Sequence, residues 1–298
     1  MKNLSIIIVN YNTEEFLKRC LLSLGKIPES WEVIVVDNAS RDAIKYKVST
    51  IKYKTPIIFI ENKENLGFAK ANNQGIQKAK GQYILLLNPD TEVTNGTIQT
   101  ILEFMEKEKK AGVATCLVKL PDGKIDDACH RGFPTPWRAF CHFSGLSSLF
   151  PNSLLFNGYH LGYQNMEQTH EVDACMGAFM MIRRSAGDEI NWLDEDYFWY
   201  GEDIDFCYRI KQTGWSVWFI PSISILHHKG ISSGIKEHSK YLSTADEATT
   251  KKAQEARFDV MKIFYEKHYK DKYPVLVSYI VNTGITLLKN YLFSITRK

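Results

Sequence analysis

Short apolar runs alternate with amphipathic segments over the first ~90 residues of the chain. Continuous apolar runs are typical of strands that are buried on both faces, whereas the segments between them repeat their apolar residues at helical spacing. This alternation predicts a doubly covered α/β fold with a mixed, mostly parallel sheet. The predicted strands cover residues 4–9, 32–36, 57–60 and 83–87, and two of the predicted helices cover residues 67–80 and 94–110.

Polar residues gather where these strands end. Asn10 and Asp37 each follow an apolar run directly, and Asp90 follows the run 83–87 after Asn88 and Pro89. In open α/β sheets, ligands bind at the carboxyl ends of the strands. The sequence therefore predicts a ligand site at this edge of the sheet.

The chain changes character after this region. Residues 113–171 are less regular and predict strands and loops around a cleft. A charged helix is expected over residues 248–269, and an apolar helix with a polar residue at every fourth position is expected from Pro274 to about residue 295. We therefore divide the chain into a main domain, residues 1–235, and a C-terminal helical extension, residues 236–298.

The balance of charge limits the partners. The chain has 37 Lys and Arg against 34 Asp and Glu, a net charge of +3, which is too small to indicate nucleic acid as the main partner. Residues 236–298 hold 12 basic and 7 acidic side chains, a net charge of +5. This basic, partly apolar tail predicts either contact with an anionic membrane surface or packing on protein, including self-association through the C-terminal helices.

Cysteine usage and the start of the chain bear on its compartment. None of the six cysteines belongs to a C-x-x-C pair, so neither a zinc site nor a redox motif is predicted. The first strand-like run follows the initial Met1 almost directly, without the pattern of a signal peptide. We expect a cytoplasmic protein.

Three carboxylates stand at the predicted start of a helix, in the segment 201–209. Acids are favoured there by the exposed N–H groups, so a solvated first turn is one interpretation. Asp205 and Arg209 lie four residues apart and are expected to pair on one face. Glu202 and Asp203 have no such local partner, and an unpaired carboxylate beside aromatic rings is a candidate general base.

Seven motifs in a characteristic order give the chain a specific resemblance. It resembles the family 2 glycosyltransferases, inverting enzymes with the GT-A fold, and is most similar to their rhamnosyltransferase-like branch. The motifs are SIIIVNYN at 5–12, VVDNAS at 35–40, NLGFAKANN at 65–73, LLNPD at 86–90, the segment 172–184, GEDID at 201–205 and HHKGISS at 227–233.

The resemblance implies a UDP- or dTDP-sugar as donor, with dTDP-rhamnose as one candidate. Asp37 would accept a hydrogen bond from the imide N–H of the base, a task that suits an acceptor-only carboxylate. Lys70, in the first turn of a helix, would add a charge near phosphate. The donor-binding residues carried over from the family motifs are Asn10, Asp37, Asn65, Gly67, Lys70, Asn88 and Asp90.

The same resemblance implies a divalent cation, Mg²⁺ or Mn²⁺. The family places two acids separated by one residue at this position, but here the first acid is replaced by Asn88. Asp90 remains as a hard oxygen ligand, and His227 is the second expected ligand. The ion would offset the negative charge that develops on the leaving diphosphate.

Catalytic and acceptor-side roles follow in the same way. Asp203 would be the base that takes the proton of the acceptor hydroxyl, and Glu202 would position the acceptor or tune Asp203. Asp173 and Trp199 are expected on the acceptor side. The acceptor would be a growing surface polysaccharide, polyprenyl-linked, and the protein would be peripheral on the inner face of the plasma membrane.

Three other classes were weighed against this one. A sugar-nucleotide or glycan-binding module without catalysis is the main alternative, and it disagrees with the retention of Asp90, Asp203 and His227 together. A nucleotidyltransferase would need a Gly-rich loop after the first strand, and the segment 8–12 contains no glycine. A dinucleotide dehydrogenase would need a G-x-G-x-x-G motif there, which is also lacking.

Overall fold

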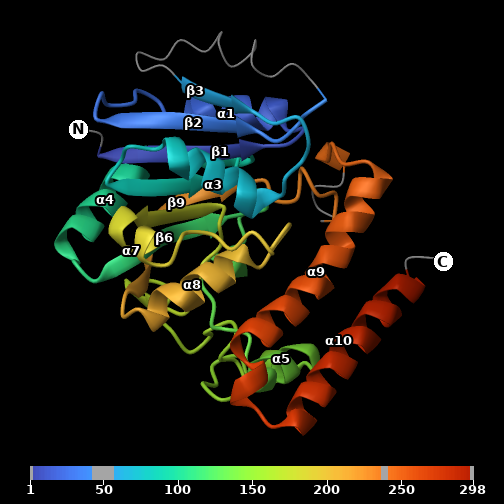
Figure 1. The fold of residues 1–298 in the computed structure, drawn as a ribbon. Helices are drawn as coiled ribbons and strands as arrows, with labels where there is room; N and C mark the ends of the chain where they lie inside the picture. Colours follow the sequence, from blue (N-terminus) through green and yellow to red (C-terminus); the bar gives the residue numbers. More distant parts are fainter. Residues whose placement is uncertain (1–2, 42–56, 236–240, 296–298) are drawn as a thin grey trace.

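The computed structural model describes residues 3–41, 57–235 and 241–295. Within these ranges the fold is mixed α/β, with one sheet of nine strands whose main path runs β3-β2-β1-β4-β8-β6-β9-β5, while β7 pairs with β9 (Figure 1). The strands are β1 (Leu4–Asn10), β2 (Trp31–Asp37), β3 (Ile57–Glu61), β4 (Tyr83–Leu87), β5 (Thr91–Val93), β6 (Ala111–Lys119), β7 (His170–Val172), β8 (Phe179–Arg183) and β9 (Ser216–His227).

The parallel part of the sheet contains the four strands predicted from the apolar runs. β1 pairs in parallel with β2 and β4, and β2 pairs in parallel with β3. The prediction is confirmed: four of the eight strand ends agree with it, and the other four differ from it by one residue. In the register of β1 and β2, Asn10 faces Asp37, so the two polar residues do meet at the carboxyl edge.

The rest of the sheet is largely antiparallel, and the irregular middle of the chain supplies part of it. β8 runs antiparallel to both β4 and β6, while β9 runs parallel to β6. β5 pairs antiparallel with β9 and sets Thr91 opposite His227. This register brings the end of the 86–90 motif next to the start of the 227–233 motif, although the two are far apart in sequence.

The helices agree with the predicted segments, and their starts are set by local backbone geometry. The expected helix at 94–110 begins at Thr97 because residues 91–93 form β5 and Gly96 adopts a left-handed φ of 83°. The α-helices are α1 (Glu14–Ser23), α3 (Phe68–Lys78), α4 (Thr97–Lys107), α5 (Pro136–Phe143), α6 (Leu146–Leu149), α7 (Arg184–Glu189), α8 (Glu202–Gln212), α9 (Glu247–His268) and α10 (Val275–Ile295).

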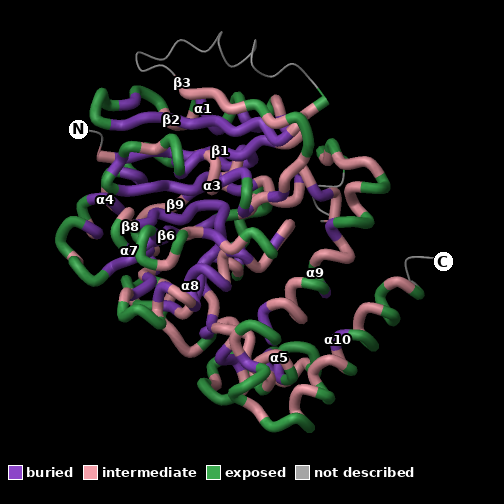
Figure 2. Tube along the Cα trace, viewed as in Figure 1, coloured by how far each residue is buried: buried purple, intermediate pink, exposed green. Residues whose placement is uncertain are grey.

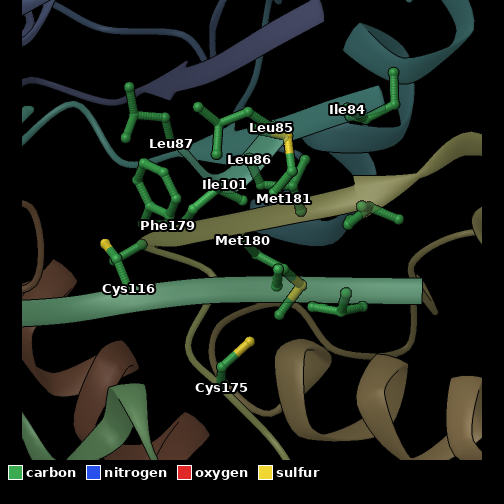
Figure 3. Packing of buried hydrophobic residues seen from close by; sticks show 14 of the residues in the cluster. Ile84, Leu85, Leu86, Leu87, Ile101, Cys116, Cys175, Phe179, Met180 and Met181 are labelled. Atoms are coloured by element: carbon green, nitrogen blue, oxygen red, sulfur yellow. The ribbon is translucent and has the colours of Figure 1, made fainter. Parts of the chain in front are cut away.

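The core lies around the central strands. Leu85 and Leu86 of β4 and Met180 and Met181 of β8 pack together with Phe179, all at most 1% exposed (Figure 3). The strands are buried along most of their length, whereas the C-terminal helices are mainly intermediate or exposed (Figure 2). The sheet is therefore a rigid platform for the polar residues at its edge.

The C-terminal helices α9 and α10 form a pair beside the sheet, with α5 near their lower part (Figure 1). α10 packs on α9 through the Tyr265–Ser278 hydroxyl contact at 2.9 Å and the Lys289–Asp259 ion pair at 3.1 Å. Its other side leaves large apolar residues exposed. No helix in the described ranges has the length and apolar character to cross a membrane. The predicted boundary at residue 235 adjoins residues 236–240, which lie outside the described residues, and it stays a prediction.

Candidate active site

A cavity of about 760 Å³ opens beside the carboxyl ends of β1 and β4 and extends between α5, α8, α9 and α10. This volume is within the range of ~300–1,000 Å³ that is usual for small-molecule sites. Eight of the predicted site residues line it: Asn65, Gly67, Asn88, Asp90, Trp199, Glu202, Asp203 and His227.

The other four predicted residues, Asn10, Asp37, Lys70 and Asp173, do not line the cavity. Asn10 and Asp37 are buried next to it and bond to each other, with Asn10 Nδ2 donating to Asp37 Oδ1 at 2.9 Å. Ser40 donates its hydroxyl to the same oxygen at 2.6 Å. The carboxylate of Asp37 thus shapes the loop after β2, and its contact with a base remains a prediction.

The loop before α3 is held by side-chain amides. Asn38 Nδ2 donates to Asn65 Oδ1 at 2.8 Å, and the Gly67 N–H donates to the same oxygen at 3.0 Å. Gly67 has a φ of 86°, and a Cβ there would lie 2.7 Å from the carbonyl oxygen of Phe198, so this position requires glycine. The N-terminus of α3 is therefore fixed next to the cavity, while Lys70 is exposed in its first turn.

A line of charged groups crosses the polar end of the cavity. His227 Nε2 lies 3.3 Å from Asp90 Oδ1, and His227 Nδ1 lies 3.4 Å from Asp126 Oδ2. Lys229 Nζ donates to the other oxygen of Asp126 at 2.5 Å. The pairing of β5 with β9 brings Asp90 close to His227, because it sets Thr91 opposite His227 and the His228 N–H donates to the Asp90 carbonyl at 2.9 Å.

These contacts change the protonation of the groups. Burial favours the neutral form of His227, but the carboxylates of Asp90 and Asp126 outweigh it and raise its pKa to about 9. Burial likewise opposes ionisation of Asp90, yet His227 holds the pKa of that carboxyl below its ordinary value. In the absence of a bound cation, His227 thus acts as the positive partner of two carboxylates.

The donor set at this point fits a divalent cation that is shared with a diphosphate. Among the described residues, no three His, Cys, Asp or Glu side chains are grouped so as to enclose a metal ion. Asp90 and His227 are the available pair, and the buried Oδ1 of Asn88 forms no hydrogen bond with any described residue. Mg²⁺ and similar ions are commonly held by one or two protein ligands plus substrate phosphates, so an incomplete protein shell is compatible with this chemistry.

Asp203 lies in the first turn of α8 and also lines the cavity. Its Oδ2 accepts a hydrogen bond from Arg131 Nη2 at 2.6 Å and one from the Gly177 N–H at 3.3 Å. Its side chain is 12% exposed, so it keeps access to the cavity. Gly201 precedes the helix with a φ of 83°, which lets the chain turn sharply into α8.

Glu202 is the neighbouring acid, and its environment is different. It is 6% exposed, and its Oε2 has no hydrogen-bond partner within the part of the chain that the structure describes. Burial, followed by repulsion from the Asp203 carboxylate, raises the pKa of Glu202 to about 8. Glu202 therefore holds its proton near neutral pH.

The structure also shows the contacts of Asp205, Asp173 and Trp199. Asp205 pairs with Arg209 at 2.7 Å, as the spacing predicted, and also bonds to His268 at 2.6 Å. Asp173 accepts from Arg138 at 2.7 Å, away from the cavity. Trp199 lines the cavity, with its ring stacked against that of Tyr200.

Sequence reasoning missed three residues of the site: Arg131, Asp126 and Lys229. Arg131 and Asp126 lie in the irregular middle of the chain, where no periodic pattern or motif marks them. Only Lys229 carried a signal, since it belongs to the 227–233 motif. The ion pairs Arg131–Asp203 and Lys229–Asp126 depend on contacts between distant segments, which one sequence does not reveal.

Comparison with solved structures identifies the fold. The fold matches the crystal structure of GalNAc-T7 with UDP, GalNAc and Mn²⁺ at a TM-score of 0.57 and 16% identity, over 91% of this chain and 58% of that one. It matches S. aureus TarS 1-349 in complex with UDP at a TM-score of 0.55 and 16% identity, over 89% and 72% of the chains. The protein has the GT-A glycosyltransferase fold.

Sequence comparison then gives the family. The model of Glycosyl transferase family 2 matches residues 5–191, and the chain belongs to this family. Rhamnosyltransferase WbbL of Escherichia coli (strain K12) is 27% identical over 75% of this chain and 82% of its own length. The N-acetylglucosaminyl-diphospho-decaprenol L-rhamnosyltransferase of Mycobacterium tuberculosis (strain ATCC 25618 / H37Rv) is 26% identical over 83% of this chain and 82% of its own length.

Proposed function

We propose that this glycosyltransferase moves a sugar from a UDP- or dTDP-sugar, with dTDP-rhamnose as the first candidate, to a hydroxyl of a lipid-linked surface polysaccharide, with inversion at the anomeric carbon. The observation that carries the proposal is the shared cavity. Asp90, His227 and Asp203 all line it, which supports a donor site and a base that act within one space.

The donor would occupy the end of the cavity near β1 and β4. Asn65 and Gly67 lie beside the N-terminus of α3, which favours anions. Asp90 and His227, with the unpartnered amide oxygen of Asn88, would hold Mg²⁺ or Mn²⁺. When bound, that ion supplies positive charge for the departing diphosphate.

Asp203 would take the proton of the attacking hydroxyl. Arg131 and the Gly177 N–H hold one of its oxygens, and its exposed part faces the cavity. This contact fixes the direction in which the carboxylate accepts a proton. Glu202, protonated near neutral pH, can donate a hydrogen bond next to it. Trp199 would offer an aromatic surface to the acceptor sugar.

The acceptor and the location are part of the same proposal. The relative from M. tuberculosis is named for a diphospho-decaprenol acceptor. A lipid-linked acceptor brings the enzyme to a membrane surface, and the basic tail with the exposed apolar residues of α10 suits peripheral attachment on its cytoplasmic face.

The substitution Asp203→Asn tests this function. It preserves the shape of the side chain but removes its basicity, so kcat should fall by roughly 10²–10⁴-fold while nucleotide affinity stays within about twofold. Asp271→Asn, an exposed acid between α9 and α10, is the matched control and should leave kcat unchanged.

Two measurements make this experiment decisive. Transfer from a panel of nucleotide sugars gives kcat, and NMR of the product gives the configuration at the new linkage. Full transfer by Asp203→Asn would remove Asp203 from the mechanism, and a retained configuration would exclude inversion. Nucleotide-sugar binding by the wild type without any transfer would instead favour the non-catalytic binding module.

A further inference from the structure

The cavity continues away from the sheet into a region with apolar walls. This lower part lies between α5, α9 and α10, where Figure 1 shows α5 beside the C-terminal helices. We call it the apolar branch. Its wall is made mainly of Phe140, Phe143, Phe264, Ile280, Ile285 and Leu288.

The apolar branch is not filled by the protein itself. Phe140 is 56% exposed and Ile280 is 60% exposed, although both face a concave surface. Gly284 of α10 also lines it, and a Cβ added there would find no atom within 4 Å. Apolar side chains around an open space keep a large surface in contact with water, which an apolar occupant would remove.

The position of this branch indicates the kind of occupant. It belongs to the same cavity as Asp203 and Asp90, so one molecule can reach both regions. Such a molecule needs a polar head near Asp203 and a hydrocarbon tail between the helices. Arg257 of α9 lines the cavity as well and offers a positive charge to an anionic linker between head and tail.

We propose that the apolar branch binds the hydrocarbon chain of the lipid-linked acceptor, an inference that rests on the proposed function and assigns the acceptor's lipid part to α5 and α10. The outward side of α10 supports this reading. Val275, Leu276 and Tyr279 are 86%, 68% and 69% exposed, so an apolar surface leads from the branch toward a bilayer. The chain would then pass from the membrane along α10 to the base.

The test fills the branch with a side chain. Gly284→Leu places an isobutyl group in the open space, and Thr283→Leu adds the same group to the exposed neighbouring position of α10, which does not line the cavity. The probes are farnesyl diphosphate, geranyl diphosphate and inorganic pyrophosphate. Calorimetry gives their affinities, and urea unfolding checks that each variant is folded.

We expect the wild type and Thr283→Leu to bind farnesyl diphosphate at least about tenfold more tightly than geranyl diphosphate, because more of the chain is buried. Gly284→Leu should lose most of this difference while binding pyrophosphate as before. Equal affinities for the two prenyl diphosphates in the wild type, or an unchanged difference in folded Gly284→Leu, would overturn the inference.

Two further outcomes separate this inference from its alternatives. Light scattering that shows a dimer in the wild type and a monomer in Gly284→Leu would assign the branch to a second copy of the chain and overturn the lipid assignment. Titration with UDP, dTDP and their sugars tests the proposed function independently. If the protein binds none of these nucleotides but still binds farnesyl diphosphate more tightly than geranyl diphosphate, the proposed function would be refuted and the binding of a hydrocarbon chain in the apolar branch would not.

Discussion

Replacing Glu202 by glutamine tests whether this buried acid holds a proton at neutral pH. The amide has nearly the same shape but cannot ionise. In the wild type, burial and the Asp203 carboxylate raise the pKa of Glu202 from 4.5 to about 8. The folded protein therefore binds this proton more tightly than the unfolded chain does. The stabilisation is complete below pH 4.5 and is lost as the pH rises through about 8.

The size of the effect follows from the two pKa values. Each pH unit between them changes the free energy of unfolding by about 1.36 kcal/mol. From pH 5 to pH 9, the wild type should lose about 4 kcal/mol relative to Glu202→Gln. Urea unfolding of both proteins across this range measures the difference. Glu247→Gln, at the exposed start of α9, controls for the exchange of carboxyl for amide at a helix start.

The same variant distinguishes the roles of the two acids in transfer. Because Glu202 is protonated at pH 7, Glu202→Gln should retain most of its kcat there. The kcat of the wild type is expected to decline above pH 8 as Glu202 loses its proton, and Glu202→Gln should not show this decline. Parallel stability curves for the wild type and Glu202→Gln would refute the assignment of the proton. A loss of kcat at pH 7 as large as that of Asp203→Asn would make Glu202 the base.

Three other perturbations have defined outcomes. Arg131→Ala removes the cation that pairs with the Asp203 carboxylate, so it should lower the free energy of unfolding in urea by about 3–5 kcal/mol and also lower kcat. Arg131→Lys keeps a positive charge and should restore part of the stability and part of kcat. Equal stability and equal kcat in the two variants would mean that charge at this position is irrelevant. Asp90→Ala should abolish the gain in nucleotide affinity produced by Mn²⁺ in calorimetry, and an unchanged gain would reject Asp90 as a ligand. Truncation at Lys272 should abolish flotation with anionic liposomes, and equal flotation of the full chain and the truncated form would reject membrane attachment through α10.

The amino-acid sequence by itself determined the parallel half of the sheet. Its strands are mainly apolar runs, and the burial of β1, β2 and β4 follows from this local pattern, whereas the edge strand β3 is only partly buried. The sequence also placed Asn10 and Asp37 at one edge, since parallel strands end together. The pair of Asp205 with Arg209 was predictable because the turn of a helix brings such residues together.

Only the tertiary structure decided how the acids are used. Asp203 gains Arg131 from a segment 72 residues away, and His227 is placed between Asp90 and Asp126 by the pairing of β5 with β9. The same packing buries Glu202 and leaves one of its oxygens without a hydrogen-bond partner among the described residues. Charge, burial and the shape of the cavity depend on neighbours across the fold, whereas periodicity depends on neighbours along the chain. For this reason the strands could be predicted from the sequence, whereas the environment of each carboxylate could not.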